Sequence, residues 1–224
     1  MAQVCLHRGD LDGAMQAYQH SWPIREATGT LESPGGAGLL VDMAWVCLHR
    51  GDLDGAMQAC QHSRRIFEAI GTLESPKGAA LLGNMGILCR VRGDLDGAMQ
   101  AYQHSRRILE ATGTMESPKG AALLVNMGSV CQERGDLDGA MQAYQHSRRI
   151  FEAIGTLESP EGAGLLANMG EMCQKRGDLD GAIQAYQHSR RIFEAIGTLE
   201  SPEGAGLLAN MGEMCQKRGD LDGA

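Results

Sequence analysis

The sequence predicts an all-α fold, a solenoid of stacked antiparallel helix pairs. Two observations predict it: a 42-residue repeat fills the chain, and apolar residues recur at helical spacing within each repeat. The hexapeptide GDLDGA begins at Gly9, Gly51, Gly93, Gly135, Gly177 and Gly219. A fixed period of this length is typical of repeat architectures, and no run alternates as a strand would.

The first helix predicted in each repeat, called helix A below, is clearest after residue 158. Ser159 is a suitable N-cap, Pro160 a suitable first helical residue, and Glu161 adds negative charge to the first turn. The apolar face then follows at i, i+3, i+4 and i+7, as Leu166, Met169, Gly170 and Cys173. Gly177 is the expected end of this helix.

The second helix of each repeat, called helix B, begins directly afterwards. Asp178 is the predicted N-cap, and Gly197 is the predicted end. The apolar face between them is Leu179, Ala182, Ile183, Tyr186, Ser189, Ile192, Phe193 and Ile196. The hexapeptide therefore ends helix A, caps helix B and supplies its first turn.

Small residues in the middle of helix A predict a close helix approach. Glycine there costs about 0.5–1 kcal/mol of helix stability relative to alanine, which close packing could offset. The glycines are Gly86, Gly128, Gly170 and Gly212, with Ala44 in the first full copy. We expect their neighbours to be Ala56, Ala98, Ala140 and Ala182.

These residues resemble the tetratricopeptide repeat family, in the long-repeat form seen in kinesin light chains. Leu166, Met169-Gly170, Ala182 and Tyr186 match its signature in type and spacing, and the match covers essentially the whole chain. The repeat is 42 residues, against about 34 in the usual form. Cys173 and Ser189 depart from the pattern, and the proline has moved to the start of helix A. The resemblance implies a right-handed superhelix whose concave groove is lined by helix A and binds peptides.

The candidate peptide-binding residues lie on helix A. The resemblance implies that an amide at one position bonds the backbone of a bound peptide, since it can donate and accept together. The residues are Asn84, Asn126, Asn168 and Asn210, with Asp42 in the first full copy. The alternative is that these amides bond within the repeat or to water.

Three residues further on, the repeats differ strongly from one another. The side chains there are Trp45, Ile87, Ser129, Glu171 and Glu213. They predict a groove that is apolar near the N-terminus and acidic near the C-terminus. Drift after recent duplication is an equal alternative, because the last two copies are nearly identical.

Other functional classes find little support in the sequence. A net charge of −8 argues against nucleic acid, and no apolar run could span a membrane. No catalytic motif occurs, which predicts that the chain is not an enzyme. Histidines 42 residues apart cannot converge on one metal ion, so we expect exposed histidines and neither metal nor cofactor. Each pair of arginines on helix B, such as Arg64-Arg65, is expected to form a solvated face balanced by glutamates such as Glu68.

Cysteine usage and the ends of the chain complete the expectations. Cysteines at equivalent positions lie too far apart for disulfides, which predicts reduced thiols and a cytoplasmic location. Pro23 should kink or end its helix. We expect one array over residues 1–224, with periods 9–50, 51–92, 93–134, 135–176 and 177–218 and partial repeats at both ends.

The sequence therefore predicts a non-enzymatic scaffold for protein–protein interaction, with peptide segments of other proteins as partners. One alternative is a structural array that self-associates head to tail, because neither end has a polar capping helix. Another is the sensor segment of a larger regulator.

Overall fold

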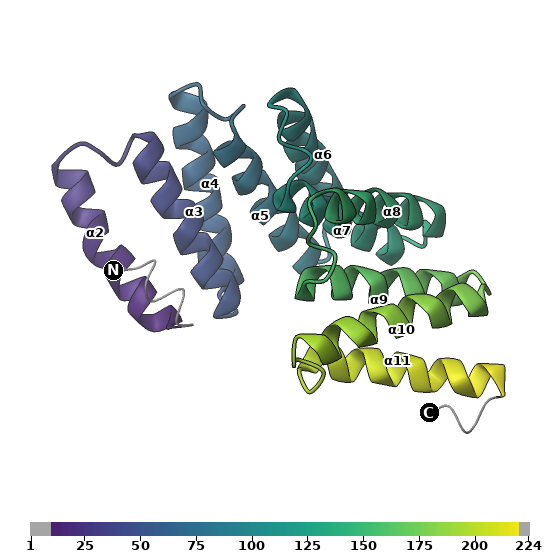
Figure 1. Cartoon of the computed structure of the whole chain (residues 1–224). Helices are drawn as coiled ribbons and strands as arrows, with labels where there is room; N and C mark the ends of the chain where they lie inside the picture. Colours follow the sequence, from purple (N-terminus) through teal and green to yellow (C-terminus); the bar gives the residue numbers. More distant parts are fainter. Residues whose placement is uncertain (1–9, 220–224) are drawn as a thin grey trace. The chain divides into compact units, whose positions relative to one another are not determined.

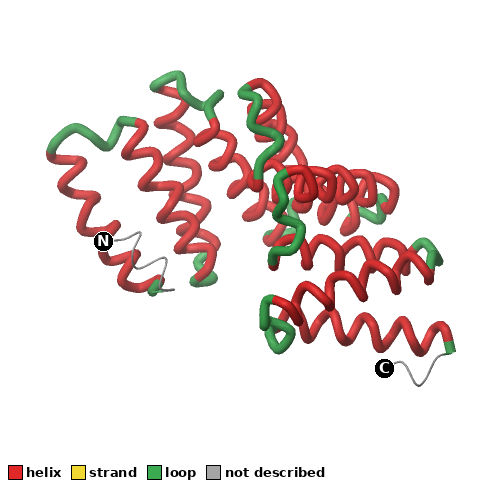
Figure 2. The backbone as a smooth tube through the Cα atoms, viewed as in Figure 1, coloured by secondary structure: helices red, strands yellow, loops and turns green. Residues whose placement is uncertain are grey.

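The computed structural model describes residues 10–219, in which it contains ten α-helices and no strand (Figures 1 and 2). The helices are α2 (Leu11–Ala27), α3 (Pro34–His49), α4 (Leu53–Ala69), α5 (Pro76–Val91), α6 (Leu95–Ala111), α7 (Pro118–Glu133), α8 (Leu137–Ala153), α9 (Pro160–Lys175), α10 (Leu179–Ala195) and α11 (Pro202–Arg218). Odd-numbered helices are helix A and even-numbered helices are helix B. The expected all-α class is confirmed.

The chain divides into two compact units, Met1–Thr114 (unit 1) and Met115–Ala224 (unit 2). Within each unit a helix A packs most closely on the helix B that follows it, as in α3–α4 and α9–α10. That helix B also contacts the next helix A, as in α4–α5 and α10–α11. Successive helix pairs therefore share their apolar faces inside each unit. The expectation of one array over the whole chain stays a prediction.

Helix A begins as predicted, with a serine cap and a proline at its first residue. In α9 the Ser159 hydroxyl accepts from the backbone N–H of Gly162 at 3.2 Å. Sequence reasoning missed why glycine is needed there. A Cβ on Gly162 would lie 2.0 Å from the carbonyl oxygen of Leu157. Only glycine therefore lets the linker fold back onto the start of helix A.

Five of the six residues of the hexapeptide have a role that the copy at residues 51–56 illustrates. Gly51 has a φ of +78°, and the Asp52 carboxylate accepts from the backbone N–H of Gly55 at 2.9 Å. Ala56 is fully buried. Asp54 forms an ion pair with Arg92 of the next repeat. The equivalent pairs Asp12–Arg50 and Asp138–Arg176 measure 3.2 and 3.1 Å.

A buried serine replaces the family's alanine on helix B, and the structure gives the reason. The hydroxyl of Ser189 donates to the backbone carbonyl of Ala163 on the facing helix A at 2.8 Å. Ser63, Ser105 and Ser147 make the same bond to Ala37, Ala79 and Ala121 at 2.8–2.9 Å. Such a bond contributes about 1 kcal/mol and fixes the register of the two helices.

The neighbours expected for the helix A glycines were wrong. A Cβ on Gly86, Gly128 or Gly170 would lie 2.3–2.6 Å from the ring of Tyr102, Tyr144 or Tyr186, respectively. The glycine therefore makes room for the tyrosine of its own helix pair. In the first full copy both partners differ. Ala44 replaces the glycine and Cys60 replaces the tyrosine, and both residues are buried. A larger residue on helix A thus coincides with a smaller one on helix B.

Of the two outcomes expected for Pro23, a kink or the end of its helix, the second does not occur. Helix α2 continues through this residue to Ala27. Its neighbour Trp22 lies edge-on to the ring of His62 on α4, with ring centroids 5.4 Å apart.

The alanine–cysteine pair predicts a coupled change in stability. Cys60→Tyr alone should destabilise the chain by about 1–3 kcal/mol, because the ring would overlap the Ala44 side chain. Ala44→Gly together with Cys60→Tyr recreates the pair found in three other copies and should restore most of that loss. Urea unfolding of the two single variants and the double variant measures the coupling. Additive effects would contradict direct packing between these positions.

Candidate functional site

The helix A side of each unit brings together the residues that the sequence predicted to bind peptides. Successive helix A elements contact each other, α3 with α5 in unit 1, and α9 with both α7 and α11 in unit 2. Among the described helices, the helix B elements α4 and α6, or α8 and α10, make no such contact. Within each unit the helices are therefore closer together on the helix A side. We call the solvent-facing side chains there the helix A face.

Four half-buried amides lie on this face. The sequence left open whether such amides bond within the repeat, and their hydrogen bonding tests this. They are Asn84 on α5, Asn126 on α7, Asn168 on α9 and Asn210 on α11. Within residues 10–219, no hydrogen bond joins any of these side chains to another residue. Bonding inside the repeat therefore does not account for them.

The variable position is occupied by very different side chains in the two units. In unit 1, Trp45 of α3 is 37% exposed, and Ile87 of α5 is half-buried. In unit 2, Glu171 of α9 is half-buried and Glu213 of α11 is exposed. The carboxylate of Glu171 accepts from Gln132 on α7 at 2.7 Å. Lys175 lies 2.7 Å from the same oxygen.

A row of polar contacts beneath the unit 2 face was missed by sequence reasoning. The hydroxyl of Tyr144 donates to the side-chain oxygen of Gln132 at 3.1 Å, and Tyr186 does the same to Gln174. Burial, and then the charges of Glu171 and Glu213, raise the pKa of Tyr186 above its ordinary value. The signal was present in the sequence, because each glutamine precedes its tyrosine by 12 residues.

Unit 1 has a related pair at the start of its face. Tyr18 of α2 is buried near Asp42 of α3, which stands where the other repeats have asparagine. Burial, and then the negative charge of Asp42, raise the pKa of Tyr18 to about 12. Burial also raises the pKa of Asp42. The charge of Asp42 thus favours the protonated phenol, whereas Tyr18 acts on Asp42 in the opposite direction and favours its carboxylate.

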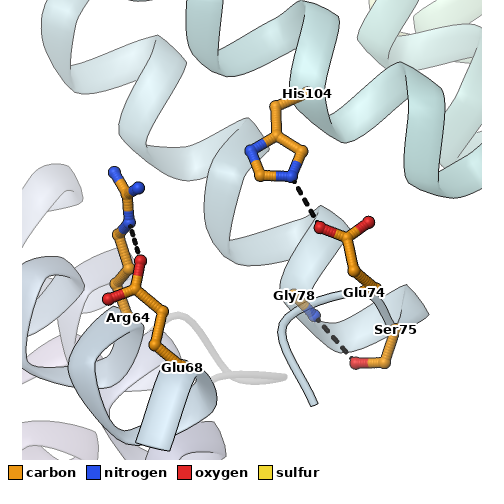
Figure 3. A network of polar contacts seen from close by, with 6 residues as sticks. All are labelled: Arg64, Glu68, Glu74, Ser75, Gly78 and His104. Carbon is orange, nitrogen blue, oxygen red and sulfur yellow. Dashed lines mark hydrogen bonds and ion pairs between the residues drawn. The ribbon is translucent and has the colours of Figure 1, made fainter. Parts of the chain in front are cut away.

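Helix B carries a regular set of ion pairs, as predicted for a balanced face. Arg64 bonds Glu68 four residues on at 2.8 Å (Figure 3). The pairs Arg106–Glu110, Arg148–Glu152 and Arg190–Glu194 repeat it at 2.7 Å. The expectation of exposed histidines was wrong in part. His104 is half-buried and lies 2.8 Å from Glu74 of the preceding linker (Figure 3), and His188 lies 3.2 Å from Glu158.

The remaining chemistry of the described residues is sparse. No three histidine, cysteine or acidic side chains among them are placed to hold a metal ion. The six cysteines described are free thiols, and burial raises the pKa of Cys60 to about 12. None of the described helices is long and apolar enough to cross a membrane.

Comparison with known proteins decides the family. A sequence model of the Tetratricopeptide repeat family matches residues 37–111 and again 78–153, which together span more than half of the chain. This chain belongs to the tetratricopeptide repeat family. No protein of curated function matches its sequence.

Solved structures share the tetratricopeptide repeat fold at low identity. The crystal structure of BtubC (BKLC) from P. vanneervenii has a TM-score of 0.79 and 18% identity, covering 96% of this chain and 86% of that one. A putative kinesin light chain of Podosopora anserina with nearly identical repeats has a TM-score of 0.68 and 17% identity, covering 85% and 90%. A Rap protein complexed with Competence and Sporulation Factor has a TM-score of 0.72 and 15% identity, covering 86% and 52%.

The Tyr18–Asp42 pair predicts a measurable titration. Asp42→Asn should lower the pKa of Tyr18 from about 12 while leaving it above 10, because burial is the larger cause. Phenolate absorbance in a chain with phenylalanine at the other three tyrosines measures it. Because the folded pKa is raised, the stability from this group is complete below pH 10 and is lost as the pH rises toward 12.

The matched control is Glu26→Gln, which removes one exposed carboxylate from the same unit. This control should leave the Tyr18 midpoint unchanged. An equal shift in both variants would show that general charge, and not Asp42, acts on the phenol.

Proposed function

We propose that this chain is a non-enzymatic scaffold that binds peptide segments of partner proteins along its helix A faces. Repeats of this family generally serve protein–protein interaction, and this coarser role follows from the family. Recognition along the helix A faces, through the asparagines and the variable residues beside them, is the specific proposal.

The observation that carries the proposal is the set of unpaired amides. The polar atoms of these amides are not among the buried atoms that lack a partner, so they stay open to solvent and to a ligand. A peptide backbone supplies one donor and one acceptor per residue, which an asparagine side chain can match together. Asn84 in unit 1 and the three amides of unit 2 could thus each bond the main chain of a segment lying across them.

Small residues beside the amides support access by a main chain. A Cβ placed on Gly83, Gly164 or Gly206 would meet nothing within 4 Å. The space over helix A next to Asn84, Asn168 and Asn210 is therefore open.

Among the structural neighbours, the Rap protein was solved in complex with Competence and Sporulation Factor. Its likeness to this chain is one of fold, so it supports the class of function and not a particular partner.

Self-association is a second candidate, favoured by one observation. Leu208 on α11 is 41% exposed, whereas the equivalent Leu166 on α9 is 1% exposed in a cluster with Tyr186 of helix B. The α11 surface could take the N-terminal helices of another copy, because interior repeats already make that contact. The third reading, a sensor segment of a larger regulator, would use the same helix A faces.

Replacing two amides tests the main proposal. Asn126→Ala together with Asn168→Ala should abolish capture of peptides selected on the intact chain, because two main-chain contacts are lost. Surface plasmon resonance of the selected peptides measures it. Gln145→Ala with Gln187→Ala is the matched control, since it removes two exposed amides from helix B of the same unit. Capture that survives in the asparagine variant would contradict the proposal.

Sedimentation equilibrium tests the second candidate. Self-association predicts an average mass that rises with concentration, and Leu208→Glu should return it to that of a monomer. A monomer at every concentration would exclude this function and leave the peptide proposal intact.

A further inference from the structure

The helix A face varies between repeats, whereas an equally exposed surface does not. Exposed positions of helix B keep one residue throughout repeats two to five. They are Gln61, Gln103, Gln145 and Gln187 at one position, and Arg65, Arg107, Arg149 and Arg191 at another. Among repeats two to five, drift would have changed both surfaces, so its effect alone does not explain differences that gather on helix A. The side chains at the variable positions therefore indicate that each unit requires a different chemistry on its helix A face.

In unit 1 four of the six variable positions on α3 and α5 are apolar. We call Trp45, Leu48, Ile87 and Val91 the unit 1 patch. Corresponding positions in unit 2 carry Ser129, Gln132, Glu171, Lys175 and Glu213. The helices of unit 2 form equally well with these polar residues. Apolar side chains are therefore not needed at these positions for the helices to form, although Leu48 packs against the core of unit 1.

The patch is continuous across two neighbouring helices. Its residues lie on α3 and α5, which contact each other. Leu48 and Ile87 occupy the positions that Gln132 and Glu171 occupy in unit 2. The side chains of Gln132 and Glu171 are hydrogen-bonded at 2.7 Å. Trp45 is 37% and Val91 is 52% exposed. The other exposed large apolar residues of the described chain are Ile24 on α2 and Leu208 on α11.

The indole of the patch is held in place before any ligand arrives. The ring of His49 stacks on Trp45 with centroids 3.8 Å apart and planes at 30°. A ring nitrogen of the same histidine lies 2.9 Å from the backbone oxygen of Trp45. A side chain already fixed loses little freedom on binding, and tryptophan is the residue type most enriched in binding hot spots.

Charge around the patch restricts the partner further. Arg90 and His49 are the ionisable residues at the variable positions of α3 and α5, and the same face also carries Asp42, whose pKa is raised by burial. The equivalent positions of unit 2 include Glu171, which is paired with Lys175, and the exposed Glu213. A basic side chain beside Arg90 would therefore meet like charge, whereas beside Glu213 it would meet opposite charge.

We propose that the unit 1 patch binds a large apolar side chain from a partner segment that has no lysine or arginine beside it. The proposal rests on the proposed function and adds the class of residue recognised. Trp45 and Val91 flank the position where that side chain is buried, and Asn84 on α5 bonds the adjoining main chain.

Residues taken from the chain's own repeats provide the test. Trp45→Glu, Ile87→Glu and Val91→Lys together give unit 1 the side chains that unit 2 carries at equivalent positions in α9. Each residue is already accommodated in the same helix context, so the variant should fold, which circular dichroism checks. Gln61→Glu, Gln103→Glu and Gln100→Lys give the matched control, with the same net charge change on exposed helix B positions.

The probe is a random library of short displayed peptides, selected on the intact chain. Enriched peptides should carry leucine, isoleucine, methionine or phenylalanine without an adjacent basic residue. Their affinity should fall at least about tenfold in the patch variant and stay unchanged in the control. In a Trp22→Phe chain, the fluorescence of Trp45 should change on binding, because the other tryptophan is gone.

The outcomes separate this inference from the proposed function. Peptides that bind the patch variant as well as the wild type, yet depend on Asn126 and Asn168, overturn the patch and leave the scaffold in place. Enrichment of basic peptides on unit 1 also overturns the patch. Failure to enrich any peptide overturns both proposals.

Discussion

A single helix pair of this sequence cannot bury both of its apolar faces, and the rest of the structure depends on that constraint. Helix B presents buried residues both to its own helix A and to the helix A that follows. Within each unit, neighbouring pairs thus shelter each other, which is why stability in such arrays is shared between adjacent repeats. The hexapeptide supports this arrangement locally, because its second aspartate reaches the arginine that ends the next helix A.

Much of the fold was predictable because its signals are local. The serine and aspartate caps, the glycines at positive φ and the helical spacing of apolar residues are each read from a few neighbouring letters, and they set the helices correctly. The residues that contact each other across a helix pair were harder to predict. The prediction placed alanines opposite Gly128, whereas the ring of Tyr144 lies there. Both candidates recur at the same period, so periodicity could not choose between them.

The same limit applies to the candidate site. Sequence patterns identified Asn126 and Asn168, and the placement of helix A brings their equivalents to one face within each unit. The patterns could not show that these amides are unpaired, since that depends on every side chain within reach. Nor could they reveal that Tyr186 supports Gln174 below the face. Pro23 shows that a local rule can leave two outcomes open, because of the kink and the helix end that it predicts only the second is contradicted by α2, which continues to Ala27.

The division of labour between the two helices follows from how each is held. Helix B is fixed by its buried serine, its tyrosine and its arginine–glutamate pairs. Helix A packs on its neighbours through its buried side alone, so the fold does not constrain the side chains on its other side. Its outward residues can therefore change from tryptophan to glutamate between units without disturbing the pair. A repeat array built this way can alter what it recognises while keeping how it folds.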